Sequence, residues 1–512
     1  MPETIPLEGG TTPTMYANAA FPHPAYARWV LEPGFAAAQR LLFPHMIAAN
    51  EAHTLMLAAT GIIPPAQAAD LLAANREVAA GGADAFTYAP AVEDLFFAVE
   101  SRLIELAGPD AGGNLQIARS RNDLDAVMCR LFLRDRLLVF RRSVVGLRTV
   151  LLDLAESHVD TLMPGITHTQ PAQPTTLAHY LLGVLGPLER DSERLAQCYA
   201  RVNRSPLGVA AFTTTSFPID RDLTARLLGF EGIVENGYDA VGASDHMLEA
   251  TQALVTTVSS LSRFVHDLLI WSRAEAGILR IDDAFVQISS IMPQKRNPVI
   301  LEHVRARTGY VHGDAATVAA VAHSAAFGDT VDVEDPIYVP LDRTFDSAGA
   351  VVGLLTVALE SAAFDIVLLA ARAGDGHTTT TALADALVRD HGLPFRTAHG
   401  IVSRLVKETV SNGSPIDATA VSAVAAEVLG RPLPIDESWL TATLDPLRFV
   451  EARAIPGGPA PSATRAAIAT ARALLAADDV DITMAAGAIT TAVHDRARRI
   501  DAFSTGTPTI PA

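Results

Sequence analysis

Two serines and a lysine share the polar segment SSIMPQKRNP at residues 289–298. Lys295 follows Ser289 by six positions and Ser290 by five. A nearby ammonium group stabilises an alkoxide, so a serine here could serve as a base that removes a proton from carbon. The segment lacks the glycines of a phosphate-binding loop, and nothing suggests the Ser-His-Asp order of acyl-transfer enzymes. The alternative is a solvated turn that happens to contain two serines.

A second polar segment, ARSRNDLD at residues 118–125, precedes the longest stretch of helical periodicity. Ser120, Asn122 or Asp123 could simply cap that helix. Arg121 and Asn122 could also present a guanidinium fork, an amide and free backbone N–H groups at a helix N-terminus, which together suit a carboxylate. The sequence leaves both interpretations open.

The third polar segment, MPGITHTQPAQPTT at residues 163–176, combines prolines with hydrogen-bonding side chains. Proline stiffens the backbone and blocks a regular helix up to Pro174. A rigid connector between helices would explain the prolines. It would not explain Thr167, His168 and Gln170, and a histidine beside such groups is a candidate for anchoring a ligand or handling a proton.

Helical periodicity covers most of the chain and must position these segments. Long patterns run over residues 126–160, about 240–280 and 298 to about 325, whereas alternating strand patterns are scarce. The sequence therefore predicts a mainly α-helical fold in which two smaller helical domains flank a central bundle of long helices. The predicted domains are residues 1–118, 119–366 and 367–512. Helices this long expose more apolar surface than one bundle buries, so we expect a homo-oligomer.

The formal net charge of −18 over 512 residues argues against a nucleic-acid partner, because no basic stripe offsets it. An anionic substrate stays open, since a few fixed cations can override the average field. The two cysteines, Cys129 and Cys198, show no metal-ligand spacing and are expected to be buried thiols.

The sequence shows no uninterrupted apolar run long enough to cross a membrane. Its first residues do not have the pattern of a signal peptide, so we expect a cytoplasmic protein without a membrane partner. Residues 1–20 and 504–512 are expected to be loose tails.

The three polar segments, in this order and in front of long helices, resemble the motifs of the aspartase/fumarase superfamily, and of its argininosuccinate lyase branch in particular. SSIMPQKRNP is a highly specific motif of that branch, and the resemblance covers nearly the whole chain. It implies a three-domain, mainly helical subunit in a homotetramer whose active sites each combine segments from three subunits. Further blocks that resemble the branch are EDLFFAVESRL (93–103), SPLGVAAFTTTSFPIDRDLTARLLGF (205–230), NGYDAV (236–241), LPFRTAHGIV (393–402) and LDPLRFVEARAIPGGPAP (444–461).

The resemblance also implies a reaction, the anti β-elimination of an amine from an N-substituted aspartate to give fumarate. A base removes the Cβ proton, and cations and hydrogen-bond donors stabilise the dianion that develops. On the family pattern Ser289 is the base, and His168 and Lys295 complete the catalytic set. The substrate is then a small dicarboxylate or amino acid, and no metal or organic cofactor is required. The substrate-binding residues implied are Ser120, Arg121, Asn122, Thr167, Ser290, Met292 and Asn297.

The chain departs from the branch mainly around the leaving amine. Phe96 stands where a histidine is usual, Ile288 where a glycine is usual, and Val299 where an aspartate is usual. Residues 242–245 read GASD, without the usual arginine, and residues 325–336 read AAFGDTVDVEDP in place of a Tyr-Asn-Lys-Asp-Leu-Gln run. We therefore expect fumarate formation with a different amine, ethylenediamine-N,N'-disuccinate being the leading candidate substrate. The alternatives are argininosuccinate and a non-catalytic, crystallin-like structural role.

Overall fold

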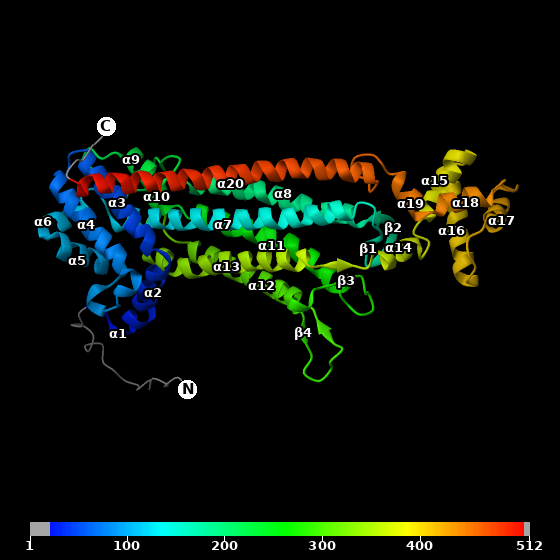
Figure 1. Ribbon diagram of the computed structural model, residues 1–512, viewed down its shortest axis with the longest axis horizontal. Coiled ribbons are helices and arrows are strands. Elements are labelled where there is room, and N and C mark those ends of the chain that lie inside the picture. Colours follow the sequence, from blue (N-terminus) through cyan, green and yellow to red (C-terminus); the bar gives the residue numbers. More distant parts are fainter. Residues whose placement is uncertain (1–20, 506–512) are drawn as a thin grey trace.

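The computed structural model describes residues 21–505 as an elongated, mainly helical body (Figure 1). Short helices from the N-terminal part of the chain form one end, at the left of Figure 1. Long helices form the middle, and a second group of short helices forms the opposite end. The prediction of a mainly α fold with a central long-helix bundle is confirmed.

The helices fall into three groups along the body. The N-terminal group comprises α1 (Pro24–Tyr26), η2 (Ala27–Leu31), α2 (Glu32–Leu41), α3 (Phe43–Ala59), α4 (Pro65–Gly81), η3 (Ala83–Ala85), η4 (Pro90–Val92), α5 (Leu95–Ala107), α6 (Pro109–Gly113) and η5 (Asn114–Gln116). The bundle comprises α7 (Arg121–Ser157), α8 (Leu177–Val202), α11 (Asp245–Trp271), α12 (Val299–Ala322), α13 (Val331–Glu360) and α20 (Pro461–Ser504), with α9 (Arg221–Leu228), α10 (Gly237–Gly242) and η6 (Asp283–Phe285) in its connections. The C-terminal group comprises α14 (Ile366–Gly374), α15 (Thr380–His391), α16 (Phe395–Asn412), α17 (Ala418–Leu429), α18 (Glu437–Leu444) and α19 (Pro446–Glu451).

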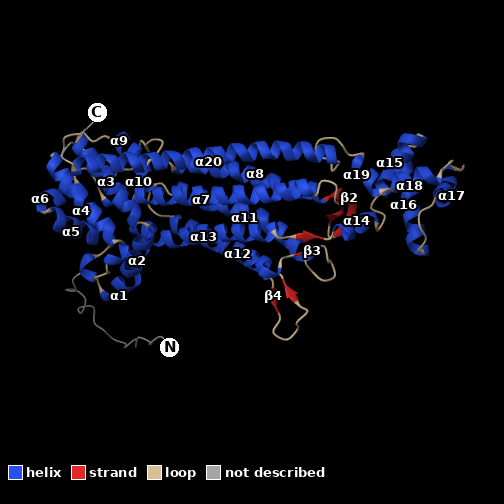
Figure 2. Cartoon of the chain, viewed as in Figure 1, coloured by secondary structure: helices blue, strands red, loops and turns tan. Residues whose placement is uncertain are grey.

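The strands are short and pair in twos, all antiparallel (Figure 2, red). The longest pair, β1 (Leu162–Thr167) with β2 (Gln170–Thr176), is a hairpin at the C-terminal end of α7. A second hairpin, β4 (Gln287–Ile288) with β5 (Arg296–Asn297), extends away from the bundle. The third pair joins β3 (Leu279–Arg280) to β6 (Ala363–Phe364).

Helix α7 is the central element of the bundle, and its sequence explains its length. It contains no proline, and a capping box at Ser120 satisfies the backbone N–H groups at its start. Along its 37 residues, apolar side chains recur at intervals of three and four and are buried against α8, α13 and α20. The buried residues of this stripe are Leu133, Leu137, Phe140, Val144, Leu147 and Leu151.

The last long helix, α20, lies alongside α7 and returns the chain to the N-terminal group, where it packs against α3, α4 and α9. The predicted segment 367–512 therefore contains a bundle helix as well as the separate C-terminal group. That group has a core of its own around Leu387, Leu405 and Leu440. The three domain boundaries themselves stay a prediction.

Among the described helices, α11 is long and apolar enough, by length and composition, to cross a membrane. The apolar stretch that meets this test is 18 residues long and includes polar residues, and 44% of the stretch is buried within this chain. Because α11 packs against α8, α12 and α13, we interpret it as a core helix of the bundle.

A substitution of buried Asp342 on α13 tests how ion pairs stabilise the bundle. Only 2% of its side chain is exposed, and its carboxylate pairs with Arg40 on α2, at 3.0 Å, and with Arg136 on α7. Asp342→Asn removes the charge that both guanidinium groups share. We expect it to lower the free energy of unfolding by roughly 2–3 kcal/mol, measured by urea denaturation.

Asp346→Asn is the matched control, since Asp346, also on α13, pairs with Arg136 of α7 but has a side chain that is 58% exposed. An exposed pair contributes at most about 1 kcal/mol. Equal losses in the two variants would contradict the interpretation.

Candidate active site

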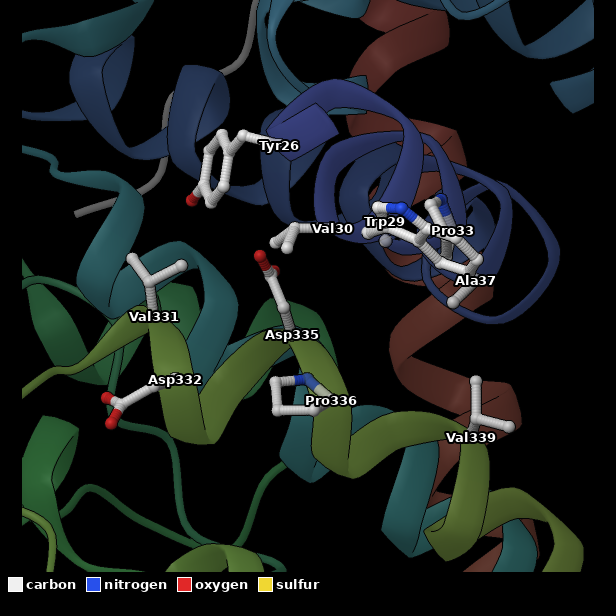
Figure 3. Close-up of a pocket in the computed structure, with 11 residues that line it drawn as sticks. Tyr26, Trp29, Val30, Pro33, Ala37, Val331, Asp332, Asp335, Pro336 and Val339 are labelled. Carbon is white, nitrogen blue, oxygen red and sulfur yellow. The ribbon is translucent and has the colours of Figure 1, made fainter. Parts of the chain in front are cut away.

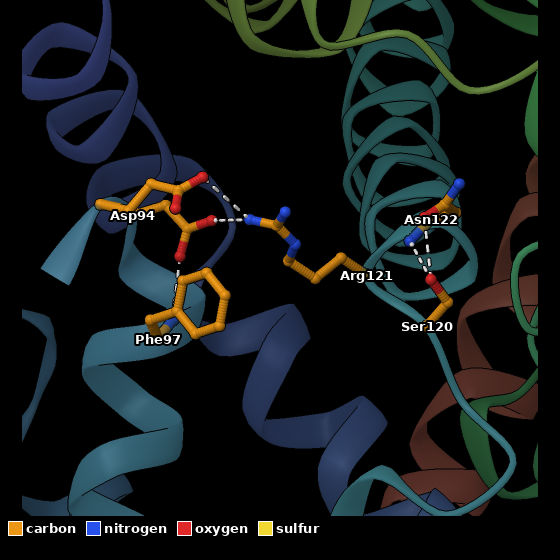
Figure 4. Close-up of polar contacts among 6 residues, drawn as sticks. Asp94, Phe97, Ser120, Arg121 and Asn122 are labelled. Carbon is orange, nitrogen blue, oxygen red and sulfur yellow. Dashed lines mark hydrogen bonds and ion pairs between the residues drawn. The ribbon is translucent and has the colours of Figure 1, made fainter. Parts of the chain in front are cut away.

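The first polar segment forms the N-terminus of α7. The Ser120 side chain and the Asp123 carboxylate cap the helix reciprocally, so the capping interpretation of this segment is correct. Arg121 extends toward the start of α5 and donates hydrogen bonds to Asp94 Oδ2 at 2.7 Å and, more weakly, to Glu93 at 3.5 Å (Figure 4). Its guanidinium lies over the Phe97 ring, 4.9 Å from the centroid.

These contacts limit what Arg121 can offer to a ligand. Asp94 occupies one side of the Arg121 guanidinium group, and the Arg121 side chain is 42% exposed. A ligand carboxylate could therefore accept hydrogen bonds only from the remaining N–H donors of this group. Asn122 lies beside it, and its Oδ1 accepts the Ser120 hydroxyl at 2.8 Å. The segment is therefore both a helix cap and an exposed group of donors.

The second segment became a β-hairpin, where the sequence predicted a proline-stiffened loop. Thr167 pairs with Gln170, and the two residues between them form the turn. His168 and Thr169 both have positive φ, 50° and 64°, as two-residue hairpin turns require. Non-glycine residues adopt this conformation at a cost of about 1–3 kcal/mol each, and such strain clusters at functional sites. Thr167 and His168 are exposed at this tip.

The third segment is the tip of the β4–β5 hairpin. The Ser289 hydroxyl accepts the backbone N–H groups of Ile291 (3.3 Å) and Met292 (3.1 Å), and the Asn297 amide donates to the Gln287 carbonyl at 3.0 Å. Ser290, Met292 and Lys295 are exposed at this tip. Two large apolar side chains are exposed as well, Ile288 at 78% and Ile291 at 83%.

A single chain does not bring the three segments together. The first and second lie at opposite ends of α7, and 37 residues of α-helix span about 55 Å. The third projects from the side of the bundle (Figure 1). Within residues 21–505, no hydrogen bond or ion pair joins any two of the segments. A complete site would need more than one copy of the chain.

The described part of the chain has two large hollows, and one of them lies next to the second segment. A groove of about 630 Å³ separates the N-terminal helices from α13, with Tyr26, Trp29 and Val30 on one side (Figure 3). Asp335 points into it from α13. Beside the β1–β2 hairpin, a pocket of about 760 Å³ is lined in part by Thr167. Within the described residues, no group of three or more His, Cys, Asp or Glu side chains could hold a metal ion.

Sequence reasoning treated Asp123 as a cap and missed its second role. One carboxylate oxygen accepts Ser120 N at 2.9 Å, and the other accepts Gly208 N at 2.8 Å and Ala210 N at 3.0 Å. Asp123 is fully buried, and burial raises its pKa to about 6 in spite of these hydrogen bonds. It thus ties the 205–210 segment to the start of α7. A pattern of residue types within one segment cannot reveal a contact with a segment 85 residues away.

Comparisons with known proteins agree with this architecture and with the motifs. A family model described as "Lyase" matches residues 36–313, more than half of the chain, and one described as "Argininosuccinate lyase C-terminal" matches residues 377–451. The chain belongs to the argininosuccinate lyase branch of the aspartase/fumarase superfamily. It is a fumarate-forming carbon–nitrogen lyase in type.

The relatives of this lyase are similar over most of their length. An argininosuccinate lyase of Methanoculleus marisnigri is 42% identical over 427 residues, 83% of this chain and 86% of the relative. An argininosuccinate lyase of Natronomonas pharaonis is 39% identical over 477 residues, 92% of this chain and 94% of the relative. Among solved structures, EDDS lyase in complex with formate has a TM-score of 0.84 at 29% identity, with 95% of this chain and 97% of that one covered.

Asp123 provides a test of how the first segment of this lyase is positioned. An amide at position 123 can accept on one side only and would place its NH₂ group against backbone N–H donors. Asp123→Asn is expected to lower the free energy of unfolding by about 1–3 kcal/mol and to raise the KM of the lyase reaction, because the start of α7 loses its tie to the 205–210 segment.

Chemical denaturation and initial-rate kinetics measure the two effects. The control is Asp84→Asn, at an exposed carboxylate of the N-terminal group. A variant at position 123 with unchanged stability and KM would remove Asp123 from this positioning role.

Proposed function

We propose that this lyase cleaves argininosuccinate to arginine and fumarate. The observation that carries the proposal is the set of relatives between 37% and 42% identical, each covering more than four-fifths of this chain, that are named argininosuccinate lyase. The sequence alone favoured an aminopolycarboxylate as the substrate and gave argininosuccinate as an alternative. On this evidence we place argininosuccinate first.

The proposed chemistry begins at the succinyl half of the substrate. Ser289 takes the Cβ proton, and the electron pair moves through the aci-carboxylate to form the Cα–Cβ double bond. The C–N bond breaks, the nitrogen keeps its electron pair, and a proton returns to it, for which His168 is the candidate donor. Lys295 would stabilise the ionised serine and the dianion.

The remaining roles are assigned to exposed and half-buried groups on the three segments. They would bind the two carboxylates of the succinyl half, whose negative charge grows during the reaction. The residues assigned are Ser120, Arg121, Asn122, Thr167, Ser290, Met292 and Asn297. Closure of the β4–β5 hairpin over the substrate would exclude water and strengthen each of these contacts.

The separation of the segments leads us to propose a homotetramer whose sites each combine three subunits. The length of α7 keeps the first and second segments apart in one chain. The apolar side chains of Ile288 and Ile291 on the projecting hairpin are suited to contact another copy. A cytoplasmic location also stays a proposal.

A second candidate substrate is ethylenediamine-N,N'-disuccinate, which has the same succinyl-amine head. Two observations favour it. EDDS lyase is similar to this chain in structure over nearly its full length, and the departures at Phe96, Val299 and residues 325–336 concern the amine half. A crystallin-like structural role has less support, since the catalytic set of the branch is intact.

The deciding experiment is fumarate release, followed by absorbance, from a panel of N-substituted aspartates. Argininosuccinate is expected to give the highest kcat/KM. A higher value with ethylenediamine-N,N'-disuccinate would transfer the proposal to the second candidate. Fumarate release from no panel member would overturn both and favour the structural role.

Ser289→Ala tests the assignment of the base. Loss of a general base typically lowers the rate about 10²- to 10⁴-fold, and we expect a fall in kcat of that size with unchanged assembly on size-exclusion chromatography. Ser411→Ala, at an exposed serine of the C-terminal group, is the control for serine removal as such. If the Ser289 variant keeps most of its activity, another residue is the base.

A further inference from the structure

A cavity of about 240 Å³ lies one helical turn beyond Arg121. Its walls come from α7, from the connection between α10 and α11, and from the segment that joins α12 to α13. Asp125, four residues after Arg121, lines it. Residues at this spacing share one face of a helix, so the cavity adjoins the first polar segment.

The cavity has acidic groups and no cation of its own. Asp125 and Glu334 line it from α7 and α13, and Asp329 lies next to Glu334. No lysine or arginine is among its lining residues. Two cations lie near it: Arg121 is paired with Asp94 at 2.7 Å, and the charge of buried Arg130 acts on the lining groups Cys129, Asp245 and His246.

The cavity is therefore a poor environment for negative charge. Burial, followed by repulsion from neighbouring carboxylates, raises the pKa of Asp125 to about 8. Burial and contact with Asp329 raise the pKa of Glu334 to about 11. A bound cation would reverse both effects, because it stabilises the ionised carboxylates.

A second, independent observation indicates a ligand. His246 also lines the cavity and is only 7% exposed, yet its Nδ1 is buried without a hydrogen-bond partner. Asp245 Oδ1 lies 3.9 Å from that nitrogen, and Nε2 lies 3.9 Å from Cys129 Sγ. The hydroxyl of Thr330, on the opposite wall, likewise has no partner. Buried polar groups are nearly always satisfied in native proteins, by protein, water or ligand.

Two closely packed glycines shape one wall of the cavity. A Cβ at Gly242 would lie 2.8 Å from the backbone N of Gly328, so these two glycines bring the GASD and AAFGD segments together. The arginine that the family resemblance leads one to expect within residues 242–245 is absent. Three carboxyl groups, those of Asp125, Asp245 and Glu334, line the space.

We propose that this cavity binds a cationic nitrogen group, a guanidinium or an ammonium, on the amine half of the substrate, held by Asp125 and Glu334. The link to the substrate rests on the proposed function. The volume is smaller than the roughly 300–1,000 Å³ of a whole small-molecule site, so the cavity takes one arm of a ligand. Within the lyase reaction, Asp125 and Glu334 are specificity-determining residues for the leaving amine.

The test compares n-butylguanidinium with its uncharged isostere n-butylurea, by calorimetry on the full-length wild-type enzyme with and without saturating fumarate. The guanidinium is expected to bind at least tenfold more tightly than the urea. Asp125→Asn and Glu334→Gln should each weaken guanidinium binding at least tenfold and change urea binding less than twofold. Glu360→Gln, which removes an exposed charge at the far end of α13, should leave both unchanged.

Equal binding of the two probes, or no binding of the guanidinium, would overturn the proposal without any variant. So would Asn and Gln variants that fold normally by circular dichroism and keep wild-type guanidinium affinity. Because neither probe is a substrate, these outcomes are independent of the fumarate-release panel. If no panel member releases fumarate but the guanidinium binds as expected, the proposed reaction is wrong. If the panel succeeds but the guanidinium does not bind as expected, the proposed role of the cavity is wrong.

Discussion

The unbroken length of α7 is the constraint on which the rest of the structure depends. It is kept long by a capped start, the absence of proline and a continuous buried stripe that packs against three other long helices. A rigid rod of this length holds the donors at Arg121 and the strained hairpin tip at His168 at opposite ends of the bundle. Any reaction that uses both groups must therefore take place between chains. For this reason the proposed mechanism requires the proposed tetramer.

Buried charge fixes the neighbours of α7. Arg148 is fully buried and pairs with Asp478 on α20, Arg141 pairs with Asp481 on the same helix at 2.6 Å, and Arg136 reaches Asp342 on α13. A charge taken out of water is tolerated only with its partner in place. These pairs therefore favour the observed arrangement, in which α13 and α20 lie beside α7.

The same electrostatic rule separates the two halves of the candidate site. Around the first segment, Arg121 has its carboxylate partners and Asp123 has three N–H donors, so these charged groups are paired within one chain. The adjoining cavity holds carboxyl groups without a cation and a histidine nitrogen without a partner. In the proposed site the first segment would bind the succinyl half, and the cavity would bind a group of opposite charge on the leaving amine.

The sequence by itself determined the helical class, the long α7 and the three polar segments, because periodicity, capping and motif spacing are local properties of a chain. It also determined the family, since ordered motifs such as SSIMPQKRNP need no coordinates. Even locally it missed the β1–β2 hairpin, whose prolines suggested an irregular loop, and it did not predict the 44-residue α20 as a bundle helix. Only the tertiary structure decided that the segments lie apart in one chain, that Asp123 holds a distant loop, and that Asp125 and Glu334 share one cavity. Each of these facts depends on which residues far apart in sequence meet in space, and a local pattern carries no information about that.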